Sequence, residues 1–378
     1  MSKSTLQQLA DYGQSAWLDY ISRSLIESGK LKKLIDLGLR GMTSNPSIFN
    51  QSIGSTNEYD AAISRLKNAN KSTFEIYDEL TIKDIQDAAD CFLPVYEKTK
   101  KLDGYVSLEI NPLLANKIKE QADEGLRLFK KVNRPNLMIK VPSTKSGFDV
   151  IEELIANGIN VNVTLIFSLE QYIQTVKAYF RGLKRLSQKE ENLSHVRSVA
   201  SVFVSRVDTT IDAILDAKIK NEKDKIKQIK LGSLKGRAAV ANSRIIFEKF
   251  KEMFASDEYK QLFKKRANVQ RVLWGSTSTK NPQYSDVKYV SELIVKPTVN
   301  TIPEPTLNAF LDHGKVKDAF HYDASEAESI IQTLKDEGIL INQICAKLLD
   351  EGLVAFDKAF ETLLQSIEKK AAQLVPAK

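Results

Sequence analysis

A lysine and two acidic residues interrupt three short apolar segments that have the composition of β-strands. Lys140 lies within LMIKV, Glu109 within VSLEI and Asp19 within WLDYI. A lysine amine attacks a carbonyl carbon only in its neutral form, and at its ordinary pKa of about 10.4 it is almost wholly protonated at neutral pH. Burial between Ile139 and Val141 would favour the neutral amine, because desolvation penalises the charged form. The three residues therefore predict Schiff-base chemistry at Lys140, with Asp19 and Glu109 moving protons.

An imine at Lys140 would withdraw electrons from the neighbouring carbon, so that a C–C bond beside the former carbonyl can break or form. This chemistry needs neither a metal nor an organic cofactor, and we expect none. Two cysteines are too few for a thiol-rich metal site, and the three histidines lie too far apart for a HExxH motif, which argues against transition-metal catalysis. These residues are Cys91, Cys345, His195, His313 and His321.

Eight short segments rich in Val, Ile, Leu or Thr are predicted to be strands, and helical sequence follows each of them. They span residues 16–21, 38–44, 104–110, 136–142, 158–167, 196–204, 271–277 and 297–303. Alternating strands and helices predict parallel strands joined by right-handed crossovers. Because the count is eight and no GxGxxG follows the first strand, we predict an α/β fold of the (β/α)8 TIM-barrel type over an open doubly wound sheet.

The remaining sequence is predicted to be helical. We expect helical insertions near 52–103 and 208–268, and a helical extension over 304–378 that packs on the barrel. Residues 1–378 would then form a single domain whose core strands span about 16–303. One helix is predicted over 168–188, and it begins at Ser168, a residue type that caps helix N-termini.

The alternation of side chains along a strand places the polar residues of these segments on one face. Lys140, Glu109 and Asp19 would point into the barrel, together with Asn162 and Thr164. Charged residues in such an interior are costly unless they are paired. Two interpretations follow: a buried salt-bridge network that fixes the packing, or a catalytic centre at the carboxyl ends of the strands.

The charge balance of the 378-residue chain is modestly basic, with a net charge of +7, and favours anionic partners. Lysines are dense over 217–237, either as a nucleic-acid or membrane patch or as the solvated face of one surface helix. We favour the second, because no aromatic residues interleave with the lysines as base-stacking platforms would. No apolar run is long enough for a signal peptide or a membrane span, so the predicted location is cytoplasmic.

Seven segments resemble the signature sequences of transaldolases. They match in order between about residues 15 and 305, and as a set they are very specific. WLDYISR (17–23) and STSTK (276–280) resemble the longer bacterial and cyanobacterial branch of that family. The other five are GMTSNPSIF (41–49), SLEINP (107–112), MIKVPST (138–144), NVNVTLIFS (160–168) and ASVFVSRVD (200–208).

The resemblance implies four catalytic residues. Lys140 matches the lysine that forms the Schiff base, and Asp19 matches the acid and base that takes the substrate hydroxyl proton as the C–C bond breaks. Glu109 and Thr164 match a pair that holds a catalytic water for forming and hydrolysing the imine.

The resemblance also implies six substrate-binding residues. Asn45 and Asn162 match amides that bind the dihydroxyacetone portion of the substrate. The phosphate-binding positions, where a guanidinium can bind phosphate in bidentate fashion, are matched by Ser201, Arg206, Ser278 and Lys280.

Some of these residue types also have a purely structural interpretation. An asparagine before proline, as at Asn45, commonly caps a turn, and Ser278 and Lys280 could be ordinary loop residues. For Phe203 we favour core filling. The related fructose-6-phosphate aldolases carry a tyrosine near Phe203 and a glutamine near Glu109, so these two residues favour transfer over free aldol cleavage.

The implied function is that of a transaldolase of the pentose phosphate pathway. Such an enzyme moves a dihydroxyacetone unit from sedoheptulose 7-phosphate or fructose 6-phosphate to glyceraldehyde 3-phosphate or erythrose 4-phosphate. The alternatives are a Schiff-base aldolase like fructose-6-phosphate aldolase, which releases free dihydroxyacetone, and an inactive sugar-phosphate-binding barrel. The expected partners are sugar phosphates, with no nucleic acid and no membrane, and the expected assembly is a monomer or homodimer.

Overall fold

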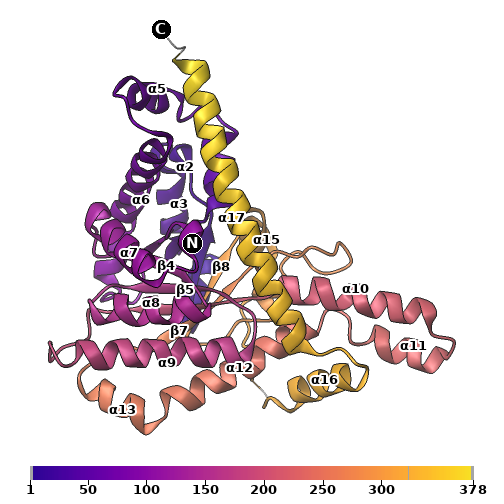
Figure 1. Ribbon diagram of the computed structural model, residues 1–378. Coiled ribbons are helices and arrows are strands. Elements are labelled where there is room, and N and C mark those ends of the chain that lie inside the picture. The colour runs from indigo at the N-terminus through magenta and orange to yellow at the C-terminus, as the bar shows by residue number, and fades with distance from the viewer. Residues whose placement is uncertain (1–2, 322, 376–378) are drawn as a thin grey trace.

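Eight parallel strands close into a barrel in the order of the sequence. Figure 1 shows the computed structural model, which describes residues 3–321 and 323–375. This confirms the predicted (β/α)8 fold. The strands are β1 (Gln14–Asp19), β2 (Gly41–Thr43), β3 (Tyr105–Glu109), β4 (Leu137–Pro142), β5 (Val161–Ile166), β6 (Ser198–Phe203), β7 (Gln270–Gly275) and β8 (Thr298–Ile302).

The helices surround this barrel and extend beyond it at both predicted insertions. They are α1 (Thr5–Tyr12), α2 (Arg23–Glu27), α3 (Lys30–Asp36), α4 (Pro46–Phe49), α5 (Asp60–Asn68), α6 (Thr73–Lys98), α7 (Ile118–Val132), α8 (Lys145–Ala156), α9 (Leu169–Leu186), α10 (Ser205–Asn221), α11 (Lys225–Gly232), α12 (Ala238–Phe254), α13 (Asp257–Lys264), α14 (Lys288–Ser291), α15 (Glu304–His313), α16 (Ser325–Asp336) and α17 (Ile341–Leu374). A π-helical turn, Asn50–Gly54, and a 3₁₀ turn, Pro112–Leu114, complete the set. No helix of the described residues is both long enough and apolar enough to cross a bilayer.

Some predicted boundaries differ from those observed. β1 begins two residues before the predicted start and ends at Asp19, and β2 is limited to Gly41–Thr43. The residues before β2 form the turn after α3, where Gly38 has a φ of +108° that other residues rarely adopt. The predicted N-cap of α9 is confirmed. The Ser168 hydroxyl accepts from the backbone N–H of Gln171, and the Gln171 side-chain oxygen accepts from the backbone N–H of Ser168.

The sequence suggested that the lysine-rich stretch, residues 217–237, forms the face of one helix. This prediction is wrong. The stretch covers the end of α10, a turn, α11 and the residues that follow α11. The break arises because Asp224 accepts a hydrogen bond from the backbone N–H of Ile226 at 2.8 Å and so caps a new helix. The two helices project from the body of the molecule side by side (Figure 1).

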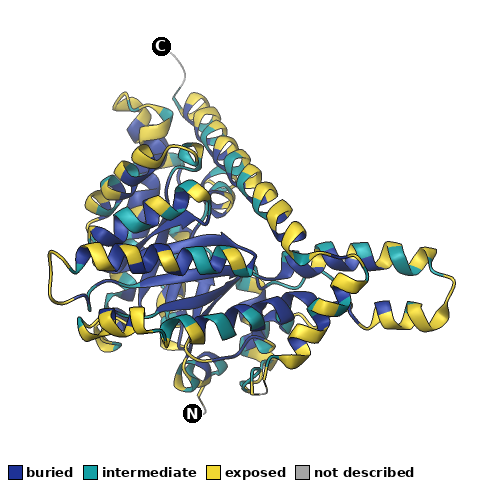
Figure 2. Cartoon of the chain, turned by 60° about the horizontal axis from the view of Figure 1, so that its bottom comes forward, coloured by how far each residue is buried: buried dark blue, intermediate teal, exposed yellow. Residues whose placement is uncertain are grey.

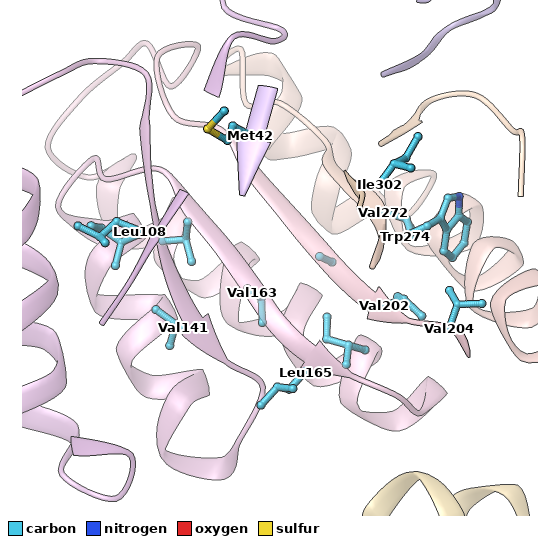
Figure 3. Packing of buried hydrophobic residues seen from close by; sticks show 14 of the residues in the cluster. Met42, Leu108, Val141, Val163, Leu165, Val202, Val204, Val272, Trp274 and Ile302 are labelled. Carbon is cyan, nitrogen blue, oxygen red and sulfur yellow. The ribbon is translucent and has the colours of Figure 1, made fainter. Parts of the chain in front are cut away.

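Two apolar layers follow from the alternation of side chains along the strands. Outward-facing residues such as Leu108, Val141 and Val202 pack under the helices (Figure 3). Inward-facing residues, among them Trp17 and Met138, form a separate cluster inside the barrel. Because Lys140 shares a face with Met138, the predicted inward direction of the polar residues agrees with this arrangement.

The interior cluster depends on a glycine of β2. Gly41 lies beside Trp17, and a Cβ on this glycine would meet the indole at 2.6 Å. A larger residue at position 41 would therefore displace the tryptophan. Gly41 allows the indole to fill the barrel below the level of the polar residues.

A buried ion pair lies beneath this cluster. Arg271 donates to Asp103 at 2.8 Å and to the Ser15 hydroxyl at 2.9 Å, and that hydroxyl donates to the second Asp103 oxygen. Asp103 and Arg271 are only 4% and 5% exposed. The pair therefore joins the loop before β3 to β7 and β1 in a place where neither charge can find bulk water.

We expect Asp103→Ala to lower the free energy of unfolding by about 3–5 kcal/mol, because it leaves the Arg271 charge buried without its partner. Urea denaturation followed by circular dichroism measures this loss. The control is Asp90→Ala, which breaks the more exposed ion pair with Arg134 and should cost no more than ~1 kcal/mol. Equal losses in the two variants would show that the buried pair contributes no more to the free energy of unfolding than the exposed pair does.

The final helix, α17, runs across the molecule over 34 residues (Figure 1). It contacts α4, α5, α6, α10 and β5, so it spans elements from the first and second halves of the barrel. One side of the helix is buried and the other is exposed (Figure 2). Its buried residues recur every three or four positions, as expected of an amphipathic helix, and are Ile344, Cys345, Leu348, Gly352, Phe356, Phe360, Leu363, Ile367 and Ala371.

Candidate active site

A cavity of about 210 Å³ opens at the carboxyl ends of the barrel strands. Active sites of (β/α)8 barrels lie at this end. Nine of the ten predicted site residues line the cavity, and the tenth, Glu109, lies beside Lys140. The nine are Asp19, Asn45, Lys140, Asn162, Thr164, Ser201, Arg206, Ser278 and Lys280.

Lys140 lies at the centre of this group. It pairs in register with Glu109 of β3 on one side and Asn162 of β5 on the other, so the three side chains lie level with one another. Lys140 is 5% exposed. Its Nζ donates to the Ser44 carbonyl at 2.9 Å and lies 3.5 Å from Glu109 Oε2.

The surroundings of the lysine amine differ from those expected. The predicted aliphatic enclosure by Ile139 and Val141 is wrong, because both side chains belong to the outer apolar layer (Figure 3 labels Val141). Neighbours along a strand point to opposite faces, so they cannot enclose the side chain between them. The amine is buried among polar groups that can exchange protons with it.

Glu109 is a buried carboxylate with an incomplete set of partners. It is 6% exposed, and its Oε2 has no hydrogen-bond partner among the described residues. Burial raises the pKa of Glu109 to about 7, the positive charge of Lys140 opposes this rise, and the nearby Asp19 adds to it. A carboxyl group with this pKa can both accept and donate a proton at neutral pH.

This pKa leads to a pH prediction. Below about pH 7 Glu109 is the neutral acid and cannot accept a proton from water, so we expect kcat/KM to fall about tenfold per pH unit there and to level off above it. Glu109→Gln should lower the rate by about 10²–10⁴-fold and remove this acidic limb. Initial rates between pH 5.5 and 9 give the profile, and an unchanged limb in the glutamine variant would assign it to another group.

Asp19 lies at the end of β1 and lines the cavity. Its Oδ1 accepts from the Thr43 hydroxyl at 2.7 Å, and that hydroxyl is 2.6 Å from the Thr301 hydroxyl. Desolvation raises the pKa of Asp19, while the Lys140 charge and the Thr43 hydrogen bond oppose the rise. These contacts fix the carboxylate between β1, β2 and β8.

Asn162 and Thr164 project into the cavity from β5. The Asn162 amide donates to the Ser107 hydroxyl at 3.0 Å, and its oxygen accepts from Ser201 at 2.6 Å. Thr164 Oγ1 is buried and has no hydrogen-bond partner among the described residues. The next residue, Leu165, has a φ of +60°, and the pairing of β5 with β6 shifts register there.

Asn45 combines the two roles that the sequence left open. Its Oδ1 accepts from the Ile48 N–H at 3.0 Å and so caps α4, which confirms the turn-cap interpretation. The residue also lines the cavity. The cap fixes the oxygen, which leaves the amide N–H groups to donate to a bound molecule.

Two cations also line the cavity. Arg206 comes from the first turn of α10, and Ser278 and Lys280 come from the loop after β7. Ser278 and Lys280 are therefore loop residues that also line the cavity. Within the described part of the chain, neither Arg206 nor Lys280 has an acidic side chain within ion-pair distance. Desolvation lowers the pKa of Arg206, and Glu351 of α17 opposes this shift. Two cations without ion-pair partners favour an anionic ligand in this cavity.

Phe203 corrects one interpretation of the sequence. It lines the cavity and is only partly buried, so core filling alone does not describe it. It is the last residue of β6, on the inward face, where the strand ends at the cavity. Its ring contacts the Phe167 ring, with centroids 5.4 Å apart, and Arg206 lies 5.9 Å from its centroid.

Sequence reasoning missed several residues of the site. Thr43, Ser107 and Thr301 hold the predicted side chains in place, and their inward position on the strands is the signal that could have identified them. Phe356 of α17 also lines the cavity, far along the chain from any recognised segment. No local pattern distinguishes it from the other buried residues of that helix.

Known proteins are similar to this chain over nearly its whole length. A family model described as "Transaldolase/Fructose-6-phosphate aldolase" matches residues 16–367. A transaldolase of Trichodesmium erythraeum (strain IMS101) is 45% identical over 374 residues, which are 98% of each chain. A transaldolase 2 of Nostoc sp. (strain PCC 7120) is 43% identical over 380 residues and covers 100% of both chains.

Similarity extends to an actinobacterial protein, and the resemblance noted in the sequence is thereby confirmed. A transaldolase of Saccharopolyspora erythraea is 41% identical, covering 98% of this chain and 99% of its own. These matches and the family model cover nearly all of the chain. The chain belongs to the transaldolase/fructose-6-phosphate aldolase family.

Proposed function

We propose that this protein is a transaldolase that transfers a dihydroxyacetone unit between sugar phosphates through a Schiff base at Lys140. One observation carries the proposal: a buried lysine amine near two carboxylates and two cations without ion-pair partners among the described residues lie at the same cavity. Such a cavity suits a substrate that carries both a carbonyl group and a phosphate. The relatives named transaldolase, at 41–45% identity over the full chain, support the same activity.

The reaction begins when the Lys140 amine attacks the ketose carbonyl and water leaves, which gives an imine. Asp19 then takes the proton of the C4 hydroxyl, the C3–C4 bond breaks, and an aldose phosphate departs. The electron pair of the broken bond moves into the imine, so the three-carbon unit stays on Lys140 as an enamine. This enamine attacks the aldehyde carbon of an acceptor. Hydrolysis of the new imine then releases a ketose phosphate that is three carbons longer than the acceptor.

The other residues are assigned to binding and to water. Glu109 and Thr164 each have a buried oxygen with no hydrogen-bond partner among the described residues, and they would hold the water that enters and leaves during imine formation and hydrolysis. Asn45 and Asn162 would bind the hydroxyl groups of the dihydroxyacetone portion. The phosphate would be bound by Ser201, Arg206, Ser278 and Lys280.

The alternative of free aldol cleavage is disfavoured by two residues of the site. Phe203 lines the cavity where the related aldolases carry a tyrosine, and Glu109 stands beside Lys140 where they carry a glutamine. We also propose that residues 1–378 act as one domain, as a monomer or homodimer, in the cytoplasm. The family of metabolic enzymes supports that location, as do the two free thiols, Cys91 and Cys345.

The test is a transfer assay with fructose 6-phosphate and erythrose 4-phosphate. The purified protein should produce sedoheptulose 7-phosphate and glyceraldehyde 3-phosphate in equal amounts, with ping-pong kinetics. Release of dihydroxyacetone at the same rate without an acceptor would instead identify an aldolase. Binding of the sugar phosphates without any turnover would identify an inactive barrel.

A further inference from the structure

Phe356 of α17 lies between two cavities. One is the 210 Å³ cavity described above, and the other is a cavity of about 10 Å³ behind Glu109. Phe356 is the only described residue that lines both. Its side chain therefore forms a wall between them.

The smaller cavity has the size and lining of a water site. A cavity of roughly 10–15 Å³ holds one water molecule when polar groups face it. Glu109, Gln121 and Asp357 provide such groups, and the Oε1 of Gln121 is buried without a hydrogen-bond partner among the described residues. Glu109 itself lies 3.5 Å from Lys140, so water in this cavity would be one carboxylate away from the imine.

The position of Phe356 is fixed by its neighbours on the same face of α17. Gly352 lies one turn before it, and a Cβ there would come within 3.0 Å of Leu165, so the helix packs closely on the end of β5. Phe360 lies one turn after it and is fully buried against Tyr77. Phe356 is itself 7% exposed. Packing on both sides therefore leaves the ring little freedom to move.

If the proposed function holds, the position of Phe356 matters because the enamine on Lys140 can react in two ways. In transfer, its nucleophilic carbon forms a C–C bond with the acceptor aldehyde. In the competing reaction, that carbon takes a proton from an acid such as Asp19 and becomes the imine of dihydroxyacetone. Water then adds to the imine carbon, the C–N bond breaks, and free dihydroxyacetone leaves with Lys140 restored as the amine.

We propose that Phe356 determines reaction specificity by separating the three-carbon intermediate from the water side of Glu109. An apolar ring in this place closes the route by which water from the smaller cavity would reach the imine past Glu109, which favours transfer over release. The catalytic groups themselves lie on the strands, so Phe356 acts on the fate of the intermediate rather than on its formation.

The test compares Phe356→Ala, Phe356→Leu and the wild type. We measure the transfer rate to erythrose 4-phosphate and the release of dihydroxyacetone from fructose 6-phosphate without an acceptor. Phe356→Ala should raise the ratio of release to transfer about tenfold or more, because it joins the two cavities. Phe356→Leu retains most of the apolar bulk and should stay near the wild-type ratio. The control is Leu353→Ala, which removes apolar bulk from the same helix. Of the two cavities, Leu353 lines only the smaller one.

A second measurement follows the intermediate directly. Borohydride is added at intervals after excess fructose 6-phosphate is removed, and mass spectrometry counts the three-carbon adduct on Lys140. The adduct should decay faster in Phe356→Ala than in the wild type and in Leu353→Ala. An unchanged ratio and lifetime in Phe356→Ala, or an equal change in Leu353→Ala, would overturn this inference and leave the proposed function intact. A wild type that forms no adduct and transfers nothing would overturn both.

Discussion

Replacing Lys140 with alanine is expected to abolish transfer, with a loss of about 10⁴-fold or more in kcat/KM. Without the Lys140 amine no imine forms beside Glu109 and Asp19, because Lys280, the other lysine of the cavity, comes from the loop after β7. The variant should also lose the adduct that borohydride traps in the presence of fructose 6-phosphate. Mass spectrometry of a proteolytic digest should find the added three carbons on Lys140 of the wild type and no adduct in the variant.

The matched control is Lys145→Ala. Lys145 is an exposed lysine at the start of α8, close to Lys140 in the sequence, and its loss should leave both turnover and trapping unchanged. Lys140→Ala must also retain its fold, which its circular dichroism spectrum would show. An adduct on a different lysine in the folded variant would overturn the assignment of the nucleophile.

Asp19→Asn should give the second largest effect, a loss of about 10²–10⁴-fold in transfer. The amide can still accept the Thr43 hydrogen bond, but it cannot take the C4 hydroxyl proton, so C–C cleavage slows. Imine formation should survive because Lys140 and Glu109 are unchanged.

The distinguishing readout is the size of the trapped adduct. With fructose 6-phosphate, borohydride should trap a three-carbon unit on wild-type Lys140 and an intact six-carbon phosphate in Asp19→Asn. Thr43→Val tests the hydrogen bond separately and should produce a smaller loss, of about tenfold. Rapid accumulation of the three-carbon adduct in Asp19→Asn would assign the proton transfer to another group.

The sequence predicted the barrel well because its strands are apolar and regularly spaced. Period-two alternation in β3, β4 and β5 was enough to place Glu109, Lys140 and Asn162 on one face, and their register in the structure is level. The same alternation also predicts that Ile139 and Val141 point to the opposite face from the amine, so they cannot enclose it. Strand periodicity identifies the face of a side chain, but the polarity of its surroundings depends on the neighbouring strands.

Other parts of the site depend on tertiary contacts that no local pattern reports. The double use of Asn45, as a helix cap and as a cavity residue, needs the position of α4 relative to the barrel. Phe356 belongs to a helix that is amphipathic along its whole length, so its sequence distinguishes a buried face but not which residue reaches the cavity. The lysine-rich stretch was misassigned to one helix because a short turn interrupts it before Asp224 caps α11.

The contact between Thr43 and Thr301 has a consequence for how activity is acquired during folding. It lies where the first two strands meet the last one, and it fixes the carboxylate of Asp19. A partly folded chain whose barrel is still open between β1 and β8 would have Lys140 and Glu109 in place, but Thr43, which bonds Asp19, would lack its contact with Thr301. In refolding experiments, full turnover should therefore require closure between β1 and β8, whereas borohydride labelling of the lysine should not depend on the Thr43–Thr301 contact.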